Sequence, residues 1–281
     1  MKLVQSPNRM RKICTDLKKK GQIIGFVPTM GYFHEGHLSL MRIAKRKSDV
    51  LVVSIFVNPT QFGPKEDFKR YPRDFERDKR LLKKIGCDYL FYPEIKDIYP
   101  PGYETYVYVE NSTKILEGSF RPMHFKGVTT IVAKLFNIVM PNAAVFGQKD
   151  FQQAAVIKRM VKDLNFPVKI IVAPTIREKS GLALSSRNSY LSGEEKNQAL
   201  SLYKSLNLAK KLIESGERDS KKIKDKMRRF TLKESKAKID YISINDSETL
   251  ESLKKIKGSI VISLAVKIGK TRLIDNITIK I

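Results

Sequence analysis

The chain has 281 residues, 42% of them hydrophobic, which is enough for one large or two modest domains with packed cores. Its 54 Lys and Arg against 29 Asp and Glu give a formal net charge of +25, a balance common in proteins that bind nucleic acid or another polyanion. The basic residues are spread along the chain, however, and no aromatic RNP pattern, basic-region heptad or Cys/His finger accompanies them. We therefore expect no specific nucleic-acid partner, although a positive field would attract small anionic substrates.

Membrane and secretion signals are absent from the sequence. No apolar run approaches the roughly 20 residues that a bilayer span needs, and the segment MKLVQSPNRMRKIC has positive charges without the apolar core of a signal peptide. The two cysteines, Cys14 and Cys87, are too few for a disulfide framework and are typical of reduced thiols. We expect a cytoplasmic protein without membrane contact.

Short apolar segments alternate with helical patterns along the first two-thirds of the chain. We predict strands over residues 23–27, 50–57, 87–93, 143–147 and 168–172, and helices over 36–47, 74–85, 128–140 and 151–164. This alternation predicts an α/β fold with a Rossmann-like parallel sheet and helices on both faces. In such sheets ligands bind beyond the carboxyl ends of the strands, which selects the loops after 23–27, 50–57 and 143–147.

The last third has a different pattern. Charged amphipathic helices over 193–215 and 219–234 precede strand-like segments over 239–246, 259–269 and 271–279. This order predicts a smaller C-terminal α+β domain, with helices packed on an antiparallel sheet. We expect the Rossmann-like domain over 1–176 and the smaller C-terminal domain over 177–281.

The segment VPTMGYFHEGHLSL, residues 27–40, holds two of the three histidines. HEGH is one residue shorter than the zinc signature HExxH, and a three-histidine zinc site would need His34, His37 and His124. A metal site and histidines that only cap a helix remain alternatives. The position, after a strand and a glycine-containing turn at a helix start, favours an anion site that Gly36 would let a nucleotide approach closely. Being three apart, His34 and His37 can face one phosphate and donate to it.

Two further segments contain phosphate-binding side chains. In GQKDFQQ, residues 147–153, Lys149 offers a positive charge and Asp150 an acceptor for a ribose or a metal-bound water. In LSSR, residues 184–187, two hydroxyls and a guanidinium form a second set. Two such sets combined with an HxGH-type turn resemble the nucleotidyltransferase superfamily, whose members include enzymes that form adenylates.

Five segments make the resemblance specific. PTMGYFHEGHLSL, FVNPTQFGPKEDFKRYPRD, HFKGVTTIVAKLFN, VFGQKDFQQ and REKSGLALSSRN, in this order, are similar to the pantothenate synthetase family, also called pantoate–β-alanine ligases. The resemblance implies ATP-dependent condensation of (R)-pantoate with β-alanine, which gives pantothenate, AMP and diphosphate through an enzyme-bound pantoyl adenylate, a step toward coenzyme A. It also implies Mg²⁺ with ATP, a homodimer, an ATP- and pantoate-binding domain over 1–176 and a lid domain over 177–281. Ser180 and Gln148 depart from the family, which often has an aspartate and a glutamate there.

The resemblance implies a role for each matching residue. His37 would donate to the phosphates, supported by His34, while Lys149 and Arg187 would counter the charge on the departing diphosphate. The implied ATP site consists of Met30, Gly31, Tyr32, Phe33, His34, Glu35, Gly36, His37, Gly147, Gln148, Lys149, Asp150, Ile176, Leu184, Ser185, Ser186 and Arg187.

Three other residues are candidates for substrate and metal contacts. Gln61 and Gln153 would bind pantoate and β-alanine, because an amide can donate to a carboxylate and accept from a hydroxyl. Asp78, in the helix after RYPRD, is a candidate partner of Mg²⁺ through water, although a solvated helix face explains it equally well.

Two other functions remain open at this point. One is another adenylyl- or cytidylyltransferase with the same fold, from which NPTQFG and FQQ, the implied pantoate set, would distinguish this chain. The other is a basic nucleic-acid-binding protein that has kept the fold without catalysis.

Overall fold

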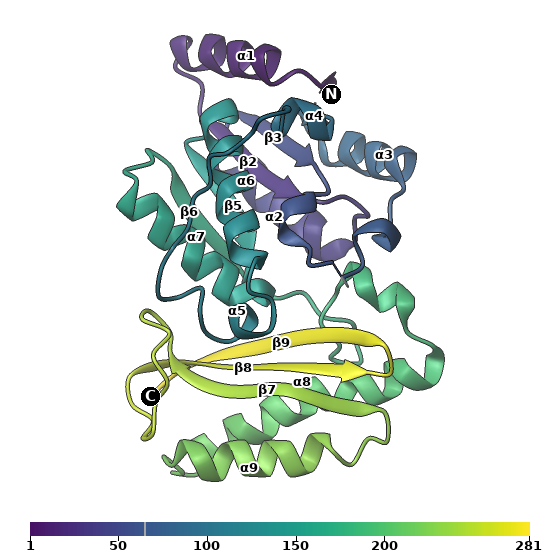
Figure 1. Cartoon of the computed structure of the whole chain (residues 1–281), viewed down its shortest axis with the longest axis vertical. Helices are drawn as coiled ribbons and strands as arrows, with labels where there is room; N and C mark the ends of the chain where they lie inside the picture. Colours follow the sequence, from purple (N-terminus) through teal and green to yellow (C-terminus); the bar gives the residue numbers. More distant parts are fainter. Residues whose placement is uncertain (65) are drawn as a thin grey trace. The chain divides into compact units, whose positions relative to one another are not determined.

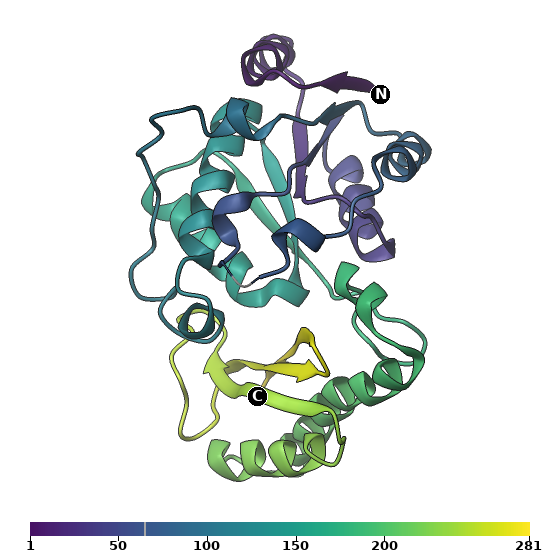
Figure 2. The ribbon, with the colours of Figure 1, turned by 45° about the vertical axis from the view of Figure 1, so that its right-hand side comes forward.

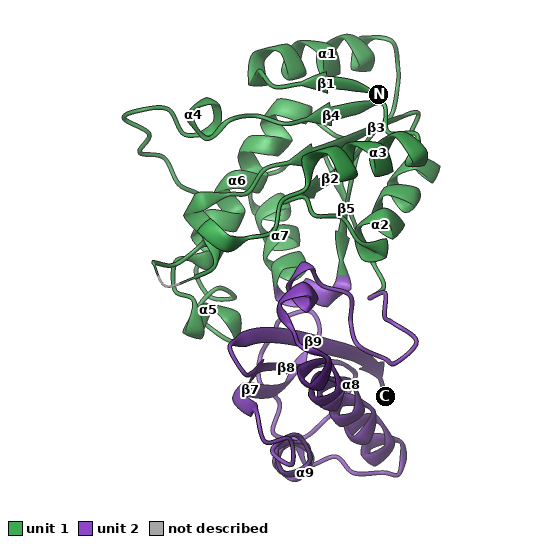
Figure 3. Ribbon diagram, turned by 90° about the vertical axis from the view of Figure 1, so that its right-hand side faces the viewer, with its two compact units in different colours: residues 1–147, 153–174 green, residues 148–152, 175–281 purple. Residues whose placement is uncertain are grey.

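The computed structural model describes residues 1–64 and 66–281, which divide into two compact units (Figure 3). The first unit comprises residues 1–147 and 153–174, and the second comprises residues 148–152 and 175–281. The second unit therefore includes residues 148–152, which interrupt the first unit along the chain. The predicted division after residue 176 stays a prediction. Among the described residues, no helix combines the length and apolar character that a membrane span requires.

The first unit is built on a six-stranded sheet in which neighbouring strands pair in parallel. The strands are β1 (Lys2–Val4), β2 (Ile24–Thr29), β3 (Val50–Ile55), β4 (Tyr89–Phe91), β5 (Ala143–Gly147) and β6 (Lys169–Ala173), in the order β1-β4-β3-β2-β5-β6. The chain runs from β2 through β3 to β4 on one side and continues with β5 and β6 on the other. The order therefore reverses between β2 and β5, where open α/β sheets bind their ligands.

Helices cover both faces of this sheet (Figure 1). In the fully buried strand β3, Val50 and Val52 belong to a core shared with α1 (Pro7–Lys19), α6 (His124–Val139) and α7 (Phe151–Asp163). Leu51 and Val53 belong to a second core shared with α2 (Glu35–Arg46) and α3 (Phe75–Ile85). A strand buried on both sides has no need of polar alternation, which is why it reads as a continuous apolar run. The predicted parallel sheet with helices on both faces is confirmed.

Among the described residues of the first unit, four of the strands and α-helices were not predicted from the sequence. They are β1, α1, and the four-residue helices α4 (Ile95–Ile98) and α5 (Glu117–Phe120). In α1 the Ser6 side chain accepts from the Arg9 amide at the helix start, yet only Met10 and Cys14 are buried. With so few apolar positions among many charges, the helical period is hard to see in the sequence. Helix α6 also begins at His124, four residues before the predicted start.

The second unit is a three-stranded antiparallel sheet with two helices (Figure 2, green helices and yellow-green strands). Strands β7 (Ala237–Asp246), β8 (Ser259–Ile268) and β9 (Thr271–Lys280) pair in that order. One core joins this sheet to α8 (Gly193–Glu214) and α9 (Ser220–Thr231). The Ser192 side chain and Glu195 form a reciprocal capping box at the start of α8. The predicted C-terminal helices on an antiparallel sheet are confirmed.

Candidate functional site

The loop after β2 is held by a carboxylate from α3. The main-chain N–H groups of Tyr32 and Phe33 donate to Asp78 Oδ2 and Oδ1, at 2.6 and 2.8 Å. Gly31 and Tyr32 both have positive φ, 82° and 53°. A Cβ on Gly31 would lie 3.0 Å from Asp78 Oδ2 and 3.1 Å from the Ile55 side chain, so glycine is required there. Asp78 is 1% exposed, and burial raises the pKa of its carboxyl.

The two histidines of the segment VPTMGYFHEGHLSL, His34 and His37, cap α2. His34 Nδ1 accepts the Gly36 N–H at 3.1 Å, and His37 Nδ1 accepts the His34 N–H at 3.4 Å, which makes a reciprocal capping box. In a neutral imidazole the nitrogen that does not accept carries the hydrogen. These contacts therefore assign the Nε2–H tautomer to both rings, whose centroids lie 4.1 Å apart. The structure combines the capping role with a pair of adjacent N–H donors.

The main-chain amides at this helix start are largely committed to the protein itself. Besides the amides that donate to Asp78 and to the two imidazoles, the Gly31 N–H donates to Thr29 Oγ1 at 3.2 Å. An incoming phosphate would compete with these acceptors. The capping contacts use the Nδ1 atoms of His34 and His37, so the Nε2–H groups are the side-chain donors that these two contacts do not use.

The loop after β3 contains a buried asparagine that sequence analysis did not single out. Asn58 is 1% exposed, and its Nδ2 donates to Gln61 Oε1 and to the Gly127 carbonyl, both at 3.1 Å. Its Oδ1 accepts from Tyr99 OH at 2.8 Å and from Thr60 Oγ1 at 3.0 Å. Tyr99 and Gly127 lie 41 and 69 residues away along the chain, so local pattern could not reveal that Asn58 is held between them and Gln61.

Two predicted site residues meet at this point. With Gln61 Oε1 occupied by Asn58, the Nε2 of Gln61 lies 3.2 Å from Met30 Sδ at the end of β2. A close approach of α6 makes this possible, because a Cβ on Gly127 would lie 2.4 Å from the Thr60 carbonyl oxygen and 2.5 Å from the Gln61 nitrogen. The glycine of HFKGV is therefore required by backbone contact with the short helix Pro59–Gln61.

The third histidine holds the main chain of Gln61. The Gln61 carbonyl lies 3.0 Å from His124 Nδ1, which must donate, so His124 Nε2 accepts from Arg121 Nη1 at 3.3 Å. Arg121 also forms a double ion pair with Glu66, at 2.7 and 2.6 Å. Burial and the Arg121 cation lower the pKa of His124 to about 4, which keeps the ring neutral. Both ring nitrogens of His124 are thus committed to holding the Gln61 loop.

This neutral histidine should give the stability of the protein a characteristic pH dependence. Its folded-state pKa of about 4 lies below the usual value of 6.5, so the unfolded chain takes up the proton first as the pH falls. The stabilising contribution is complete above pH 6.5 and is lost between pH 6.5 and 4, by up to about 3 kcal/mol. His124→Gln, whose amide can make both contacts, should lack this loss. Urea unfolding at a series of pH values checks it, and parallel curves for the two proteins would contradict it.

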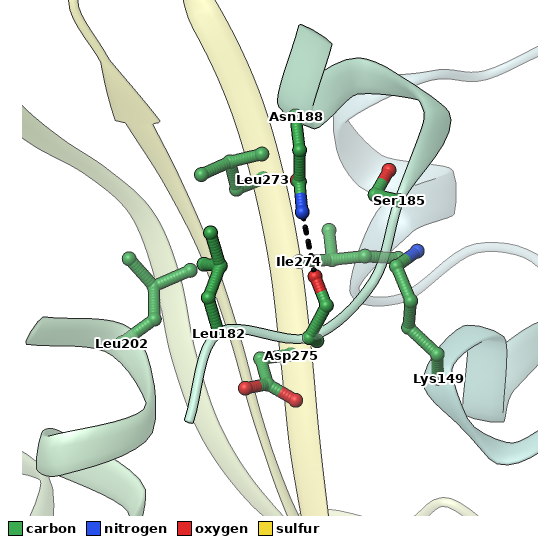
Figure 4. Close-up of a pocket in the computed structure, with 9 residues that line it drawn as sticks. Lys149, Leu182, Ser185, Asn188, Leu202, Leu273, Ile274 and Asp275 are labelled. Carbon is green, nitrogen blue, oxygen red and sulfur yellow. Dashed lines mark hydrogen bonds between the residues drawn. The ribbon is translucent and has the colours of Figure 1, made fainter. Parts of the chain in front are cut away.

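The second unit brings together the Lys-Asp and Ser-Ser-Arg sets. Lys149 lies in the short helix Gln148–Asp150, and the Ser185 Oγ accepts the Arg187 N–H at 3.3 Å at the start of Ser186–Tyr190. Lys149 and Ser185 line one pocket with Asn188 and Asp275 (Figure 4). The rest of its wall is formed by Leu182, Ala183, Leu202, Leu273 and Ile274.

Other predicted residues lie as follows. The Leu184 N–H donates to the Ile176 carbonyl at 3.0 Å, so these two residues are neighbours. Gly147 ends β5, and a Cβ on it would meet no protein atom within 4 Å. Gln153 lies on α7 and is half-buried. Among residues 1–64 and 66–281, no group of three or more His, Cys, Asp and Glu side chains is arranged to hold a metal ion.

Comparisons with known proteins agree along the whole chain. A family profile described as pantoate–β-alanine ligase matches residues 2–278. The pantothenate synthetase of Caldicellulosiruptor bescii is 55% identical over 280 residues, which cover 100% of this chain and 99% of the relative. The pantothenate synthetase of Moorella thermoacetica is 53% identical over 281 residues, again 100% and 99%.

Solved structures agree as well. The crystal structure of pantothenate synthetase from Thermus thermophilus matches with a TM-score of 0.92 and 42% identity over 99% of both chains. The pantoate–β-alanine ligase of Francisella tularensis, crystallised with beta-gamma ATP and β-alanine, matches with a TM-score of 0.80 and 39% identity over 99% of this chain and 97% of that one. The chain therefore belongs to the pantoate–β-alanine ligase family.

Proposed function

We propose that the family's reaction, the ATP-dependent joining of pantoate to β-alanine, proceeds in this chain through an enzyme-bound pantoyl adenylate. In the first step a pantoate carboxylate oxygen attacks the α-phosphorus of ATP, the bond to the bridging oxygen breaks, and diphosphate leaves. In the second step the amine of β-alanine attacks the acyl carbon, and AMP leaves with formation of pantothenate. The family membership over residues 2–278 supports the overall reaction.

The first step requires alignment and charge stabilisation more than a base. A carboxylate with a pKa near ~4 is already ionised at neutral pH, and the phosphoryl group gains charge on its oxygens as the leaving group departs. We assign the donation to these oxygens to the Nε2–H of His37, with His34 as the supporting donor. The observation that carries this assignment is the capping box, in which both Nδ1 atoms accept main-chain N–H groups and leave Nε2–H as the donor.

ATP is the substrate that the remaining residues would bind. The complex of the Francisella relative with beta-gamma ATP supports ATP binding in this family. Lys149 and Arg187 would counter the charge on diphosphate, since an ammonium and a guanidinium pair strongly with phosphate oxygens. The proposed ATP set is Met30, Gly31, Tyr32, Phe33, His34, Glu35, Gly36, His37, Gly147, Gln148, Lys149, Asp150, Ile176, Leu184, Ser185, Ser186 and Arg187.

Gln61 and Gln153 are the proposed contacts of pantoate and β-alanine. The hydrogen bond from Asn58 to Gln61 Oε1 supports this for Gln61, because it directs the NH₂ group away from Asn58 as a donor to a carboxylate. The complex of the Francisella relative with β-alanine supports a site for the amine substrate in the family.

Mg²⁺ is proposed to accompany ATP. The described residues form no three-ligand cage, which fits an ion held mainly by phosphate oxygens and water. The proposed contact of Asp78 through water would use the lone pair that each oxygen retains after accepting one main-chain N–H, and it requires a water to reach a carboxylate that is 1% exposed. In the protein, Asp78 holds the loop by accepting the main-chain N–H groups of Tyr32 and Phe33.

A glycine substitution tests the ATP set. Since no protein atom lies within 4 Å of a Cβ on Gly147, Gly147→Ala should leave the unfolding midpoint unchanged. A methyl group facing a bound nucleotide should raise the KM for ATP about 10-fold, within the range of the roughly 1–3 kcal/mol cost of overpacking. Gly193→Ala, whose Cβ also meets no atom within 4 Å at the start of α8, is the matched control and should change neither quantity. An unchanged KM for ATP in Gly147→Ala would remove Gly147 from the set.

Assembly and location complete the proposal. We propose a homodimer in the cytoplasm, with two folding domains over 1–176 and 177–281. Sedimentation equilibrium would detect the dimer, and limited proteolysis would locate the domain boundary.

The state of the two cysteines supports the proposed location. Cys14 and Cys87 are free and buried, and burial raises the pKa of each thiol to about 12, which suits thiols kept reduced.

The proposed reaction is tested by isotope exchange between ATP and diphosphate. A pantoyl adenylate predicts exchange that requires pantoate and proceeds without β-alanine, and full turnover that releases AMP only when pantoate is present. AMP release independent of pantoate would instead support another nucleotidyltransferase. Absence of any ATP chemistry, together with salt-resistant retention of RNA or DNA, would support a nucleic-acid-binding protein.

A further inference from the structure

An asparagine on β9 holds the main chain of the Lys149 segment. Asn276 is 3% exposed, and its Nδ2 donates to the Gln148 carbonyl at 3.0 Å and to the Lys149 carbonyl at 2.8 Å. Because both partners are carbonyl oxygens, only the NH₂ end of the amide can face them. The short helix that carries Lys149 is thus tied to the last strand of the second unit.

The preceding residue of the same strand holds the segment that leads to Ser185. Asp275 is 3% exposed and forms a double ion pair with Arg177, at 2.6 and 2.8 Å. Arg177 also donates to the Gly181 carbonyl at 3.2 Å and lies 4.0 Å from the Tyr203 ring centroid. Residues 177 and 183 pair as an antiparallel bridge. Asp275 therefore fixes the turn from which the Ser-Ser-Arg set follows.

These two neighbours point in opposite directions, as successive residues of a strand do. Leu273 and Ile277 lie two residues before and after Asp275, on the same face of the strand, and belong to the core shared with α8 and α9. Asn276 faces the Gln148–Asp150 segment. One strand thereby anchors two phosphate-binding sets that are far apart in the sequence. Within the second unit, it sets the distance between them.

We propose that Asn276 is a positioning residue for ATP, which acts through Lys149, and that Asp275 does the same for the Ser185–Arg187 set through Arg177. The inference rests on the proposed role of these sets in ATP binding. A lysine ammonium is a point charge on a flexible stem, so the place of its charge depends on how firmly its main chain is held. Fixing that main chain before ATP arrives reduces the ordering that binding requires.

The substitution Asn276→Ala removes both donations. We expect kcat/KM for ATP in the pantoate-dependent exchange to fall about 10- to 100-fold, the scale seen when a supporting hydrogen bond behind a ligand is lost, while the KM values for pantoate and β-alanine stay within about twofold. Asn276→Asp, of equal size, should be at least as severe, because a carboxylate would face two carbonyls. Asn276→Ser keeps one donor and should lie between wild type and alanine. Asp275→Asn, which weakens the hold on Arg177, should also lower kcat/KM for ATP.

Thr278→Ala is the matched control on the same strand. Thr278 is exposed, its Oγ1 accepts from the Gln148 side chain at a long 3.4 Å, and its loss should leave all three KM values within about twofold. A double mutant provides the second test. If Asn276 acts through Lys149, then Asn276→Ala should have little further effect in a Lys149→Ala background.

The inference is overturned if the effects of Asn276→Ala and Lys149→Ala on kcat/KM multiply in the double mutant. It is also overturned if Asn276→Asp is milder than Asn276→Ala, or if all substrates lose affinity equally. These results would indicate a general packing role. Unchanged exchange in every Asn276 variant would also reject it while leaving the ligase intact. Lack of pantoate-dependent exchange in the wild-type protein would instead reject the proposed reaction.

Discussion

Replacing His37 by alanine is expected to slow pantoyl adenylate formation about 100- to 1000-fold, which corresponds to the roughly 3–4 kcal/mol lost with one donor to a developing anion. The reason is that the capping contacts leave His37 with an Nε2–H donor in the first turn of α2. Pantoate-dependent exchange between ATP and diphosphate measures this step, and the KM for ATP should change much less than kcat, because the donation strengthens as charge develops.

Two comparisons sharpen this prediction. His37→Gln retains an acceptor for the His34 N–H and an NH₂ donor, and should recover part of the lost rate. His34→Ala removes the acceptor of the Gly36 N–H and the supporting donor, and should have a smaller effect on kcat. Exchange at nearly the wild-type rate in His37→Ala would exclude His37 from the chemistry.

Replacing Asp78 by asparagine is expected to lower both stability and adenylate formation. The carboxylate accepts from two main-chain N–H groups, at 2.6 and 2.8 Å, whereas an amide offers one acceptor and one NH₂ group that would face an N–H. An unsatisfied buried donor costs about 1–3 kcal/mol, so the free energy of unfolding should fall by about 2 kcal/mol. Displacement of the loop that precedes His34 should slow adenylate formation by up to about 100-fold.

Asp74→Asn in the same helix is the control for Asp78. Asp74 caps α3 by accepting the Arg77 N–H at 3.0 Å, and asparagine caps nearly as well as aspartate. The substitution should leave both stability and exchange close to wild type. If Asp78→Asn lowered stability without slowing exchange, the loop would not need Asp78 for its active conformation. Chemical unfolding and the exchange assay separate the two effects.

The sheet and most helices of this protein could be predicted from the sequence because their signals are local. Strand β5 has the predicted bounds, since it lies between Pro141-Asn142 and the short helix Gln148–Asp150. Helix α1 was missed because its apolar face is narrow. The sequence places the histidine motif at a helix start. It does not show which ring nitrogen of His34 and His37 accepts a main-chain N–H, because that depends on side-chain geometry.

The supporting residues were beyond the reach of sequence patterns. Asp78 contacts a loop 46 residues earlier in the chain, and Asn276 contacts carbonyls 127 and 128 residues away. Nothing in their immediate neighbours indicates such contacts. The sequence indicates Asp78 only as a possible Mg²⁺ partner and gives no indication for Asn276, because the C-terminal third contains no motif of its own. Side chains that act through another residue are visible only once the strands and helices are placed.

The capping box at the start of α2 also ties local folding to reactivity. The His34 and His37 nitrogens that close the first helical turn are the ones that set which nitrogen carries the hydrogen. When this turn opens, even briefly, both rings lose their orientation and the fixed tautomer at once. Protection of the Gly36 and His34 amides against hydrogen exchange therefore reports the fraction of molecules in which the two rings are held as the proposed phosphate donors.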